Sequence, residues 1–306
     1  MNIVALAGGV GGAKLADGLA GILAPGDLTV IVNTGDDFEH FGLYICPDLD
    51  TVCYNLAGMQ NPETGWGRVA ESWTAFEELD VLGGPTWFRL GDKDLATHLE
   101  RTRRLRGGEP LSRITADFCR RWGISSTILP MSDDPVPTIV LTEEGELEFQ
   151  DYFVARRCEP QVTGFRFANI LRSKPAPGVL EAIAAADVIV ICPSNPWVSI
   201  DPILGVPGIR TALEQKPVVA VSPLIGGKVV KGPAAKMFME LEIEPSALAV
   251  AQHYGSLLKG FVLDRSDKNL TKFLSQPFLF TDTIMLEREQ RYSLAEEVLS
   301  FARKLG

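Results

Sequence analysis

The sequence contains few residues suited to disulfides or to transition-metal sites. Five of its 306 residues are cysteine and three are histidine. The cysteines are scattered without a C-x-x-C pair, and no histidine has a partner at metal-ligand spacing. We therefore expect reduced, mostly buried cysteines, as in a cytoplasmic protein.

Long apolar runs and excess positive charge are also missing. No stretch approaches the roughly 18 consecutive apolar residues that span a bilayer, and no basic segment precedes the first apolar run, as a signal peptide would require. The net charge of −10 argues against nucleic-acid or membrane partners, because both attract basic surfaces. We expect a cytoplasmic location, with the basic run Arg101–Arg106 on a solvated helix face.

Common catalytic and nucleotide-binding motifs are absent as well. Neither G-x-S-x-G nor H-E-x-x-H occurs. From Gly9 and Gly11, the third glycine of a dinucleotide fingerprint would fall on Lys14, and Lys14 is not followed by the Ser or Thr of a P-loop. Asn33 and Thr34 stand where an acid for the ribose would be expected. An NAD(P) oxidoreductase is therefore disfavoured.

A glycine-rich segment directly follows an apolar run at the N-terminus. Ile3–Ala7 leads into Gly8–Gly12 and then into a helical pattern. This arrangement brings main-chain N–H groups close to a phosphate. The segment predicts a nucleotide or phosphoester ligand without identifying which one.

Five apolar runs of strand length recur, each followed by turn residues, at 3–7, 28–32, 188–191, 218–221 and 261–263. Continuous apolar runs are typical of strands covered on both faces, which predicts a doubly wound, Rossmann-like α/β fold with a mainly parallel sheet. We assign its core to residues 1–49 and 125–306. Residues 50–124 are expected to form a helical insertion.

The insertion is expected to contain four helices, at 50–58, 68–80, 93–106 and 112–122. Asp92 is the expected N-cap of the third helix and Ser112 that of the fourth. A β-hairpin is expected from Thr138–Thr142 and Leu147–Val154, and a C-terminal amphipathic helix from residues 286–305.

Polar or glycine-rich loops follow four of the expected strands, at 8–14, 33–37, 193–196 and 222–228. Ligands of open α/β sheets bind beyond the carboxyl ends of the strands, so we expect these loops to gather at one rim that forms the active site. There Ser194 and Asn195 offer a hydroxyl and an amide to a nucleotide, although a tight connection alone would also explain them.

Acidic residues near this rim are candidates for a divalent cation. Asp36 and Asp37 follow the second strand, and Asp48 and Asp50 lie further along the chain. Mg²⁺ prefers carboxylate oxygens and substrate phosphates as ligands, whereas turn formation and helix capping are the alternative role. We expect a metal or substrate role for at least one of Asp36, Asp37 and Asp50.

A second polar segment, Arg89–Asp94, groups cations with acids. Arginine offers a planar fork to phosphates or carbonyls, and a surface ion-pair cluster is the alternative. Of the histidines, His40 is close to the acidic loop, while His98 and His253 are expected to be packing or surface residues.

In their order, these segments resemble the 2-phospho-L-lactate transferase (CofD/FbiA-like) family. The matching blocks are Gly8–Leu15, Asn33–Asp37, Cys46–Thr51, Arg89–Leu99, Leu129–Asp134, Pro193–Pro196, Ser222–Gly227 and Lys231–Lys236. The resemblance implies a Mg²⁺-dependent enzyme of coenzyme F420 biosynthesis. Such an enzyme moves a 2-phospho-L-lactate or phosphoenolpyruvate group from a guanosine diphosphate conjugate to the deazaflavin Fo and releases GMP.

The resemblance also implies roles for individual residues. The guanosine diphosphate would be held by Gly8, Gly9, Gly11, Gly12, Lys14, Ser194 and Asn195. Asp36 and Asp50 would bind Mg²⁺, and Asp50 and Arg89 would contact Fo, with Asp50 orienting or deprotonating the Fo hydroxyl as the catalytic residue. The insertion would line the deazaflavin site, with Trp66, Trp87 and Phe88 as stacking surfaces. A homodimer is expected.

The alternative is a non-catalytic, UDP-sugar-binding regulator that resembles the gluconeogenesis-factor group. Such proteins share the N-terminal glycine loop. The Arg89–Leu99 block and the acids of Asp48–Thr51 distinguish the two hypotheses, because a pure sensor does not need them.

Overall fold

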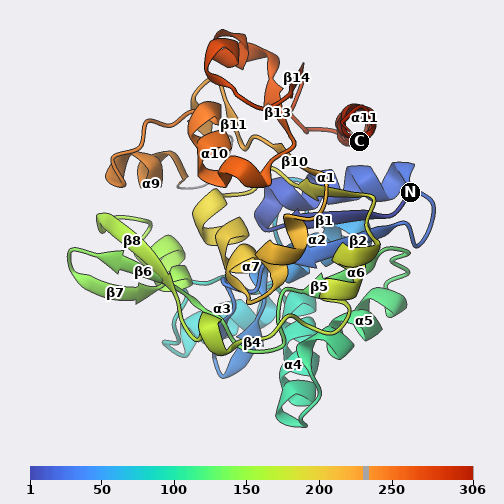
Figure 1. Cartoon of the computed structure of the whole chain (residues 1–306). Coiled ribbons are helices and arrows are strands. Elements are labelled where there is room, and N and C mark those ends of the chain that lie inside the picture. The colour runs from blue at the N-terminus through green and yellow to red at the C-terminus, as the bar shows by residue number, and fades with distance from the viewer. Residues whose placement is uncertain (230–233, 306) are drawn as a thin grey trace.

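A seven-stranded parallel sheet forms the centre of the molecule (Figure 1). The computed structural model describes residues 1–229 and 234–305. The strands run in the order β14 (Phe278–Thr281), β13 (Gly260–Asp264), β10 (Val218–Val221), β9 (Val188–Ile191), β1 (Ile3–Ala7), β2 (Leu28–Val32) and β5 (Thr127–Pro130). The predicted doubly wound α/β fold is confirmed, and four of the predicted strands have the predicted bounds.

The sheet changes direction of winding at β1, the fifth strand in this order. β1 pairs with β2 on one side, from Ile3 opposite Leu28, and with β9 on the other, from Ile3 opposite Val188. The chain therefore leaves β1 toward one edge and later returns to its other side. In open α/β sheets such a switch point leaves a crevice at the carboxyl ends of the strands, where ligands bind.

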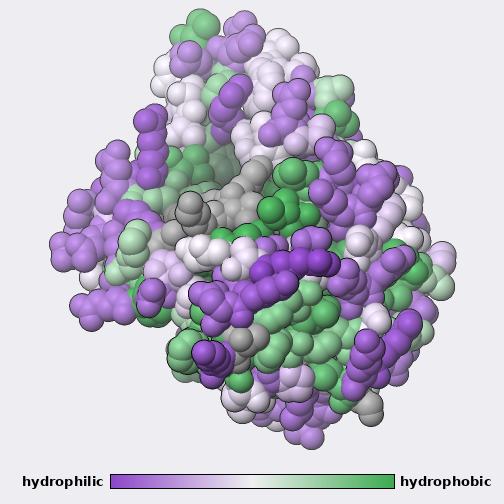
Figure 2. Space-filling view, turned by 90° about the horizontal axis from the view of Figure 1, so that it is seen from above, coloured by the Kyte–Doolittle hydropathy of each residue, from purple (hydrophilic) through white to green (hydrophobic). Residues whose placement is uncertain are grey.

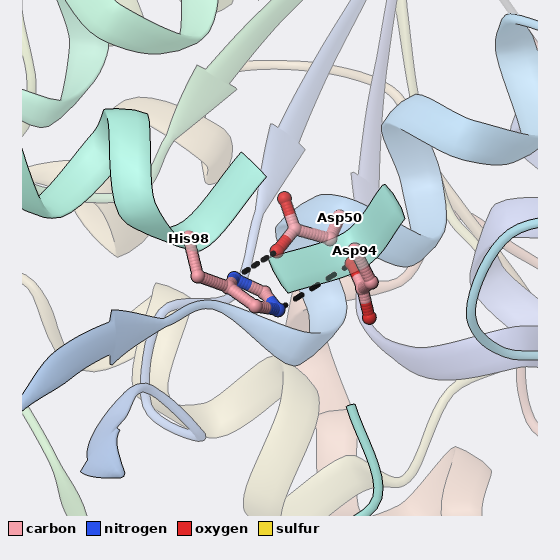
Figure 3. Close-up of side chains that lie close together, drawn as sticks. All are labelled: Asp50, Asp94 and His98. Carbon is pink, nitrogen blue, oxygen red and sulfur yellow. Dashed lines mark ion pairs between the residues drawn. The ribbon is translucent and has the colours of Figure 1, made fainter. Parts of the chain in front are cut away.

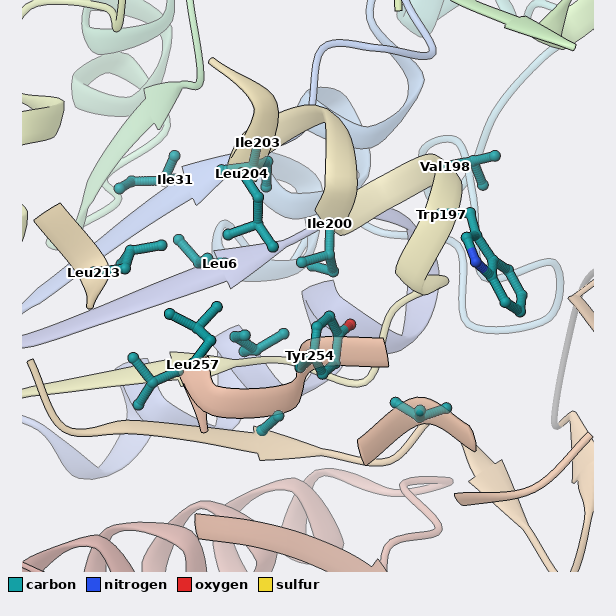
Figure 4. Packing of buried hydrophobic residues seen from close by; sticks show 14 of the residues in the cluster. Leu6, Ile31, Trp197, Val198, Ile200, Ile203, Leu204, Leu213, Tyr254 and Leu257 are labelled. Carbon is teal, nitrogen blue, oxygen red and sulfur yellow. The ribbon is translucent and has the colours of Figure 1, made fainter. Parts of the chain in front are cut away.

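Alternate residues of each strand enter two separate hydrophobic clusters, one on each face of the sheet. The first includes Leu6 and Ile31 together with Ile200, Ile203 and Tyr254 (Figure 4). Its helices include α6 (Val179–Ala185), α7 (Asp201–Gly205), α8 (Ile209–Leu213), α9 (Ala234–Glu240) and α10 (Ala247–Tyr254). Covering both faces explains why the strand sequences are continuously apolar.

The second cluster lies under α1 (Gly9–Ile22) and α11 (Arg288–Arg303), which pack against each other near the N-terminus (Figure 1). The C-terminal helix is thus confirmed. All five cysteines lie in the described part of the chain, where each is free and four are buried.

The segment between β2 and β5 begins with the hairpin β3 (Phe38–His40) and β4 (Leu43–Ile45). Four helices follow, as predicted: α2 (Pro47–Leu56), α3 (Thr74–Val81), α4 (Asp92–Arg106) and α5 (Leu111–Arg121). α2 and α5 contribute to the second cluster, whereas α3 has no buried residue. The division at 49/50 and 124/125 stays a prediction.

Both predicted N-caps are wrong. The N-cap of α4 is Gly91, and the Asp92 carboxylate instead accepts hydrogen bonds from the backbone of Thr74 and Ala75 at the start of α3. Pro110 precedes α5, and Ser112 lies inside this helix, where its N–H and hydroxyl donate to Asp133. In both cases the side chain that local sequence predicts as a helix N-cap instead forms hydrogen bonds with residues distant in the sequence.

A small antiparallel sheet lies beside the central one, formed by β7 (Gly145–Glu148), β6 (Thr138–Thr142) and β8 (Val162–Phe167) (Figure 1). The hairpin is confirmed, but its second strand ends at Glu148 rather than Val154. The chain then forms a single π-helical turn, η1 (Asp151–Ala155), which accompanies the burial of Phe149 and Tyr152.

The remaining short elements complete the C-terminal half. They are η2 (Ile170–Arg172), η3 (Pro196–Ile200), the strand pair β11 (Leu224–Ile225) and β12 (Lys228–Val229), η4 (Gly255–Leu257) and η5 (Arg265–Phe273). The predicted block Lys231–Lys236 lies partly outside the described residues, at 231–233. Throughout 1–229 and 234–305, no helix combines the length and apolarity needed to cross a bilayer.

Candidate active site

A cavity of about 720 Å³ lies at the carboxyl ends of the central strands. The loops after five strands line it: Gly8–Gly11 after β1, Asp36 after β2, Pro193–Asn195 after β9, Ser222–Pro223 after β10 and Thr283–Leu286 after β14. The structure thus brings the expected loops together at one rim. Viewed from above, this face of the molecule shows hydrophobic patches on both sides of a hydrophilic band that crosses its middle, and mostly hydrophilic side chains toward the margins (Figure 2).

Glycines allow the loops after β1 and β9 to touch. The Ser194 hydroxyl accepts a hydrogen bond from Gly8 N at 3.2 Å and donates to Gly8 O at 2.8 Å. A Cβ atom on Gly11 would lie 2.3 Å from the Pro193 carbonyl oxygen, and one on Gly12 would lie 2.6 Å from Ser194 Oγ. No other residue would permit this approach.

The same contact places the N-terminus of α1 at the cavity wall. Gly8, Gly9, Gly11, Lys14, Ser194 and Asn195 line the cavity, and Gly12 packs behind them. The backbone N–H groups and the positive end of the helix dipole make this wall favourable for a phosphate. The Lys14 ammonium donates to the Met285 carbonyl oxygen at 2.6 Å, which links this wall to the loop after β14.

Two buried carboxylates share one amide beside the glycine wall. Asn33 Nδ2 donates to Asp36 Oδ1 at 3.0 Å and to Asp48 Oδ2 at 2.9 Å, and Gly9 N donates to Asp48 Oδ1 at 2.6 Å. Burial raises the pKa of Asp48 to about 6, although these hydrogen bonds lower it in part. Burial and the Asp48 charge raise the pKa of Asp36 well above its ordinary value.

Within residues 1–229 and 234–305, no cationic side chain forms an ion pair with Asp36 or Asp48. Unpaired buried carboxylates that face a phosphate-binding wall fit a divalent cation. Asp37, also buried, has its pKa raised by burial; it is not among the cavity-lining residues.

A second cluster forms around Asp50 on α2 (Figure 3). The Arg101 guanidinium binds both Asp50 carboxylate oxygens, Nη1 donating to Oδ2 at 3.0 Å and Nη2 to Oδ1. His98 lies between two acids, with Nδ1 3.6 Å from Asp50 Oδ2 and Nε2 3.4 Å from Asp94 Oδ1. The Tyr54 hydroxyl donates to Asp94 at 2.7 Å.

In this cluster, neighbouring groups counteract the effect of burial on the pKa of a carboxylate. Burial alone would raise the pKa of Asp94, but His98, the Tyr54 hydroxyl and Arg101 outweigh it and hold that pKa below its ordinary value. Asp50, Asp94 and His98 could together offer ligand atoms to a metal ion. In the described part of the chain Asp36 is not in this group, so the joint Asp36 and Asp50 metal site stays a prediction.

One expectation about α4 is wrong. Arg101 is 2% exposed and pairs with Asp50, whereas the solvated face predicted for this run holds for Arg103. His98 is buried, as a packing residue would be, and it also lines the cavity. Asp94, His98 and Arg101 recur at helical spacing on one face, and this pattern is the signal that could have identified them.

The other histidines lie apart from the acids of the cavity. His40 is buried among Phe38, Phe41 and Trp87, and burial lowers its pKa. His253 Nε2 lies 2.8 Å from Asp201 Oδ1. Neither residue lines the cavity.

Aromatic side chains and Arg89 also line the cavity. Arg89 is exposed, and the predicted stacking residues Trp66, Trp87 and Phe88 also line the cavity. Trp87 and Phe88 additionally pack against Phe38, so both have a structural role.

The sequence interpretation missed one further aromatic pair. Phe149 and Phe153 stack with ring centres 5.5 Å apart and an interplanar angle of 17°, and both line the cavity. The expected strand at 147–154 would have placed residues 149 and 153 on one face. The proximity of these two side chains could therefore have been predicted from the sequence.

Comparison with known proteins identifies the family. The family model "2-phospho-L-lactate transferase CofD" matches residues 3–280. A phosphoenolpyruvate transferase of Streptomyces griseus is 47% identical, over 97% of this chain and 99% of that protein. A 2-phospho-L-lactate transferase of Methanosarcina acetivorans is 40% identical, over 97% and 98%.

A solved structure supports the fold. The crystal structure of a UPF0052 family member from Bacillus halodurans superposes with a TM-score of 0.63 at 17% identity, covering 97% of this chain and 98% of that one. The family model and the two enzymes together decide the assignment. This chain belongs to the 2-phospho-L-lactate transferase CofD family of transferases.

Proposed function

We propose that the protein transfers a 2-phospho-L-lactate or phosphoenolpyruvate group from a guanosine diphosphate conjugate to the deazaflavin Fo, releasing GMP, in coenzyme F420 biosynthesis. The observation that carries the proposal is one cavity with a phosphate-binding glycine wall, buried acids and an aromatic wall, in a chain of this family. The Streptomyces relatives named phosphoenolpyruvate transferase favour phosphoenolpyruvate as the donor acid.

The reaction forms one bond and breaks one. The terminal ribityl hydroxyl of Fo attacks the phosphorus distal to guanosine, and the bond from that phosphorus to the bridging oxygen breaks, so that GMP leaves. Reactions of this kind depend mainly on positioning and on neutralising charge. The glycine wall, with Ser194 and Asn195, would hold the diphosphate.

Asp50 would act at the hydroxyl. Its carboxylate is held by Arg101 and lies near His98 at the cavity, where it would orient the hydroxyl and accept its proton. Arg89, which lines the cavity and has no hydrogen-bond partner among the described residues, would bind the deazaflavin ring.

Asp36 and Asp50 are the proposed Mg²⁺ ligands. Asp48, which shares the Asn33 amide with Asp36, is a further candidate ligand. A bound Mg²⁺ would neutralise charge on the diphosphate. The unpaired, buried state of Asp36 and Asp48 is the structural feature that fits this ion.

The test supplies purified protein with Fo, Mg²⁺ and each guanylylated donor, and follows products by mass spectrometry. We expect a deazaflavin carrying the phosphorylated acid, with the phosphoenolpyruvate donor giving the most product. No product with any donor, together with tight binding of a UDP-sugar, would instead favour the regulator. The expected homodimer and cytoplasmic location are separate predictions, for light scattering and cell fractionation.

A further inference from the structure

We propose that Trp73 is a positioning residue for acceptor binding, because it holds the Arg89 guanidinium in place at the cavity. This inference rests on the proposed function and extends it to a residue outside the cavity lining. Arg89 lines the cavity, whereas Trp73 lies behind it on the side of α3.

The Arg89 side chain rests on aromatic rings. Its guanidinium carbon lies 4.3 Å from the Trp73 ring centre and 5.7 Å from that of Phe76. The two rings meet edge to face, with centres 6.2 Å apart. Cation–π attraction, strongest for tryptophan, therefore helps to hold the guanidinium over the Trp73 ring.

The N–H groups of Arg89 are left for a ligand. Among the residues that the structure describes, Arg89 forms no ion pair or hydrogen bond. A guanidinium that lies over an aromatic ring and keeps its N–H groups available can donate a planar fork to carbonyl or phenolate oxygens. The edge of a deazaflavin ring presents oxygens of this kind.

Trp73 is itself fixed by reciprocal caps between two helices. Asp92 at the start of α4 accepts from Thr74 N at 3.1 Å and Ala75 N at 3.0 Å, at the start of α3. In return, Glu71 accepts from Lys93 N at 2.6 Å and Asp94 N at 3.2 Å, at the start of α4. The ring is thereby tied to the helix that carries Asp94 and His98.

Core packing does not account for this ring. α3 has no buried residue, and Trp73 and Phe76 are each half-buried and belong to none of the hydrophobic clusters. Removing the ring should thus alter the orientation of Arg89 more than the stability of the fold.

The test is a double-mutant cycle of Trp73→Leu and Arg89→Met, with steady-state kinetics for Fo and for the guanylylated donor. We expect Trp73→Leu to raise the KM for Fo roughly three- to tenfold and to leave kcat and the donor KM unchanged. In the Arg89→Met background, Trp73→Leu should have no further effect. Trp73→Phe should restore part of the loss, and Val81→Ala, 80% exposed on the same helix, should change nothing.

The outcomes separate the two proposals. Absence of product with the unsubstituted protein overturns the proposed function and this inference with it. Normal product formation with additive effects of Trp73→Leu and Arg89→Met overturns only the role of Trp73. If Trp73→Leu does not fold, as judged by thermal unfolding, the cycle with Trp73→Phe gives the same decision from a smaller effect.

Discussion

At the scale of single residues, the buried charges of the cavity form two groups that are neutralised in different ways. Asp50 is paired with the Arg101 fork. Among the residues that the structure describes, Asp36 and Asp48 accept hydrogen bonds only from the neutral Asn33 amide and a backbone N–H. The Asp50 charge is offset within the protein even before the proposed Mg²⁺ binds, whereas the charges of Asp36 and Asp48 are left for that cation to offset.

Removal of Arg101 should destabilise the protein strongly. Arg101→Met leaves the Asp50 carboxylate buried without its partner, which typically costs about 3–5 kcal/mol. Arg101→Lys should recover part of this, because lysine keeps the charge but not the fork. Urea unfolding measures both.

Arg103→Met on the same helix is the matched control. Arg103 is exposed, and its surface pair with Glu100 should contribute less than about 1 kcal/mol. Equal stability of Arg101→Met and Arg103→Met would contradict the role of the buried pair.

In the absence of a bound cation, the buried Asp48 carboxylate should make the free energy of unfolding decrease as pH rises. The pKa of Asp48 is about 6 in the folded state and 3.8 as its ordinary value. Between these values the folded state binds more protons, so the stabilising contribution is complete below the lower pKa and lost above the higher one. Asp48 alone would account for at most about 3 kcal/mol.

Comparison with Asp48→Asn isolates this contribution. The free energy of unfolding of the unsubstituted protein should decrease more steeply between about pH 4 and pH 6.5 than that of the variant. Parallel pH profiles for the two proteins would show that Asp48 ionises normally in the fold.

At the scale of elements, the glycines of α1 determine how closely two loops approach. Gly11→Ala places a methyl group against the Pro193 carbonyl, a backbone atom that cannot rotate away. We expect a loss of about 1–3 kcal/mol in stability and weaker binding of GDP, measured by urea unfolding and calorimetry.

Gly164→Ala is the control for the loss of a glycine. Its added Cβ would meet only Leu141 Cδ1, at 3.5 Å, an ordinary contact. If both variants lose the same stability and bind GDP equally, the close approach of the loops is not what the glycine provides.

The elements also show which features follow from sequence. The first and last residues of four strands could be predicted, because burial on both faces leaves a continuous apolar run in the sequence. These strands are β1, β2, β9 and β10. The helix caps could not be predicted from local sequence, because the Asp92 carboxylate accepts a hydrogen bond at the start of α3, a helix that precedes it in the chain. Likewise Arg101 and Arg103 look equivalent in one basic run, and only the packing of α4 against β4 decides which is buried.

At the scale of the whole molecule, the cavity joins segments that are far apart in sequence. The glycine wall comes from the loops after β1 and β9, and many of the other lining residues come from the segment between β2 and β5. Sequence reasoning placed Asp50 and Arg89 among the candidates. It could not bring Asp94 and His98 to Asp50, since that contact depends on how α4 packs against the rest of the fold.

The most direct test of the account is the yield of product and GMP from the unsubstituted protein and from Asp50→Asn, with saturating Mg²⁺, Fo and donor. The account predicts equimolar GMP and phosphodiester-linked deazaflavin from the unsubstituted protein. It predicts at least about a hundredfold slower turnover from Asp50→Asn, because the group that orients the hydroxyl and accepts its proton is lost. Full turnover by Asp50→Asn would contradict the account.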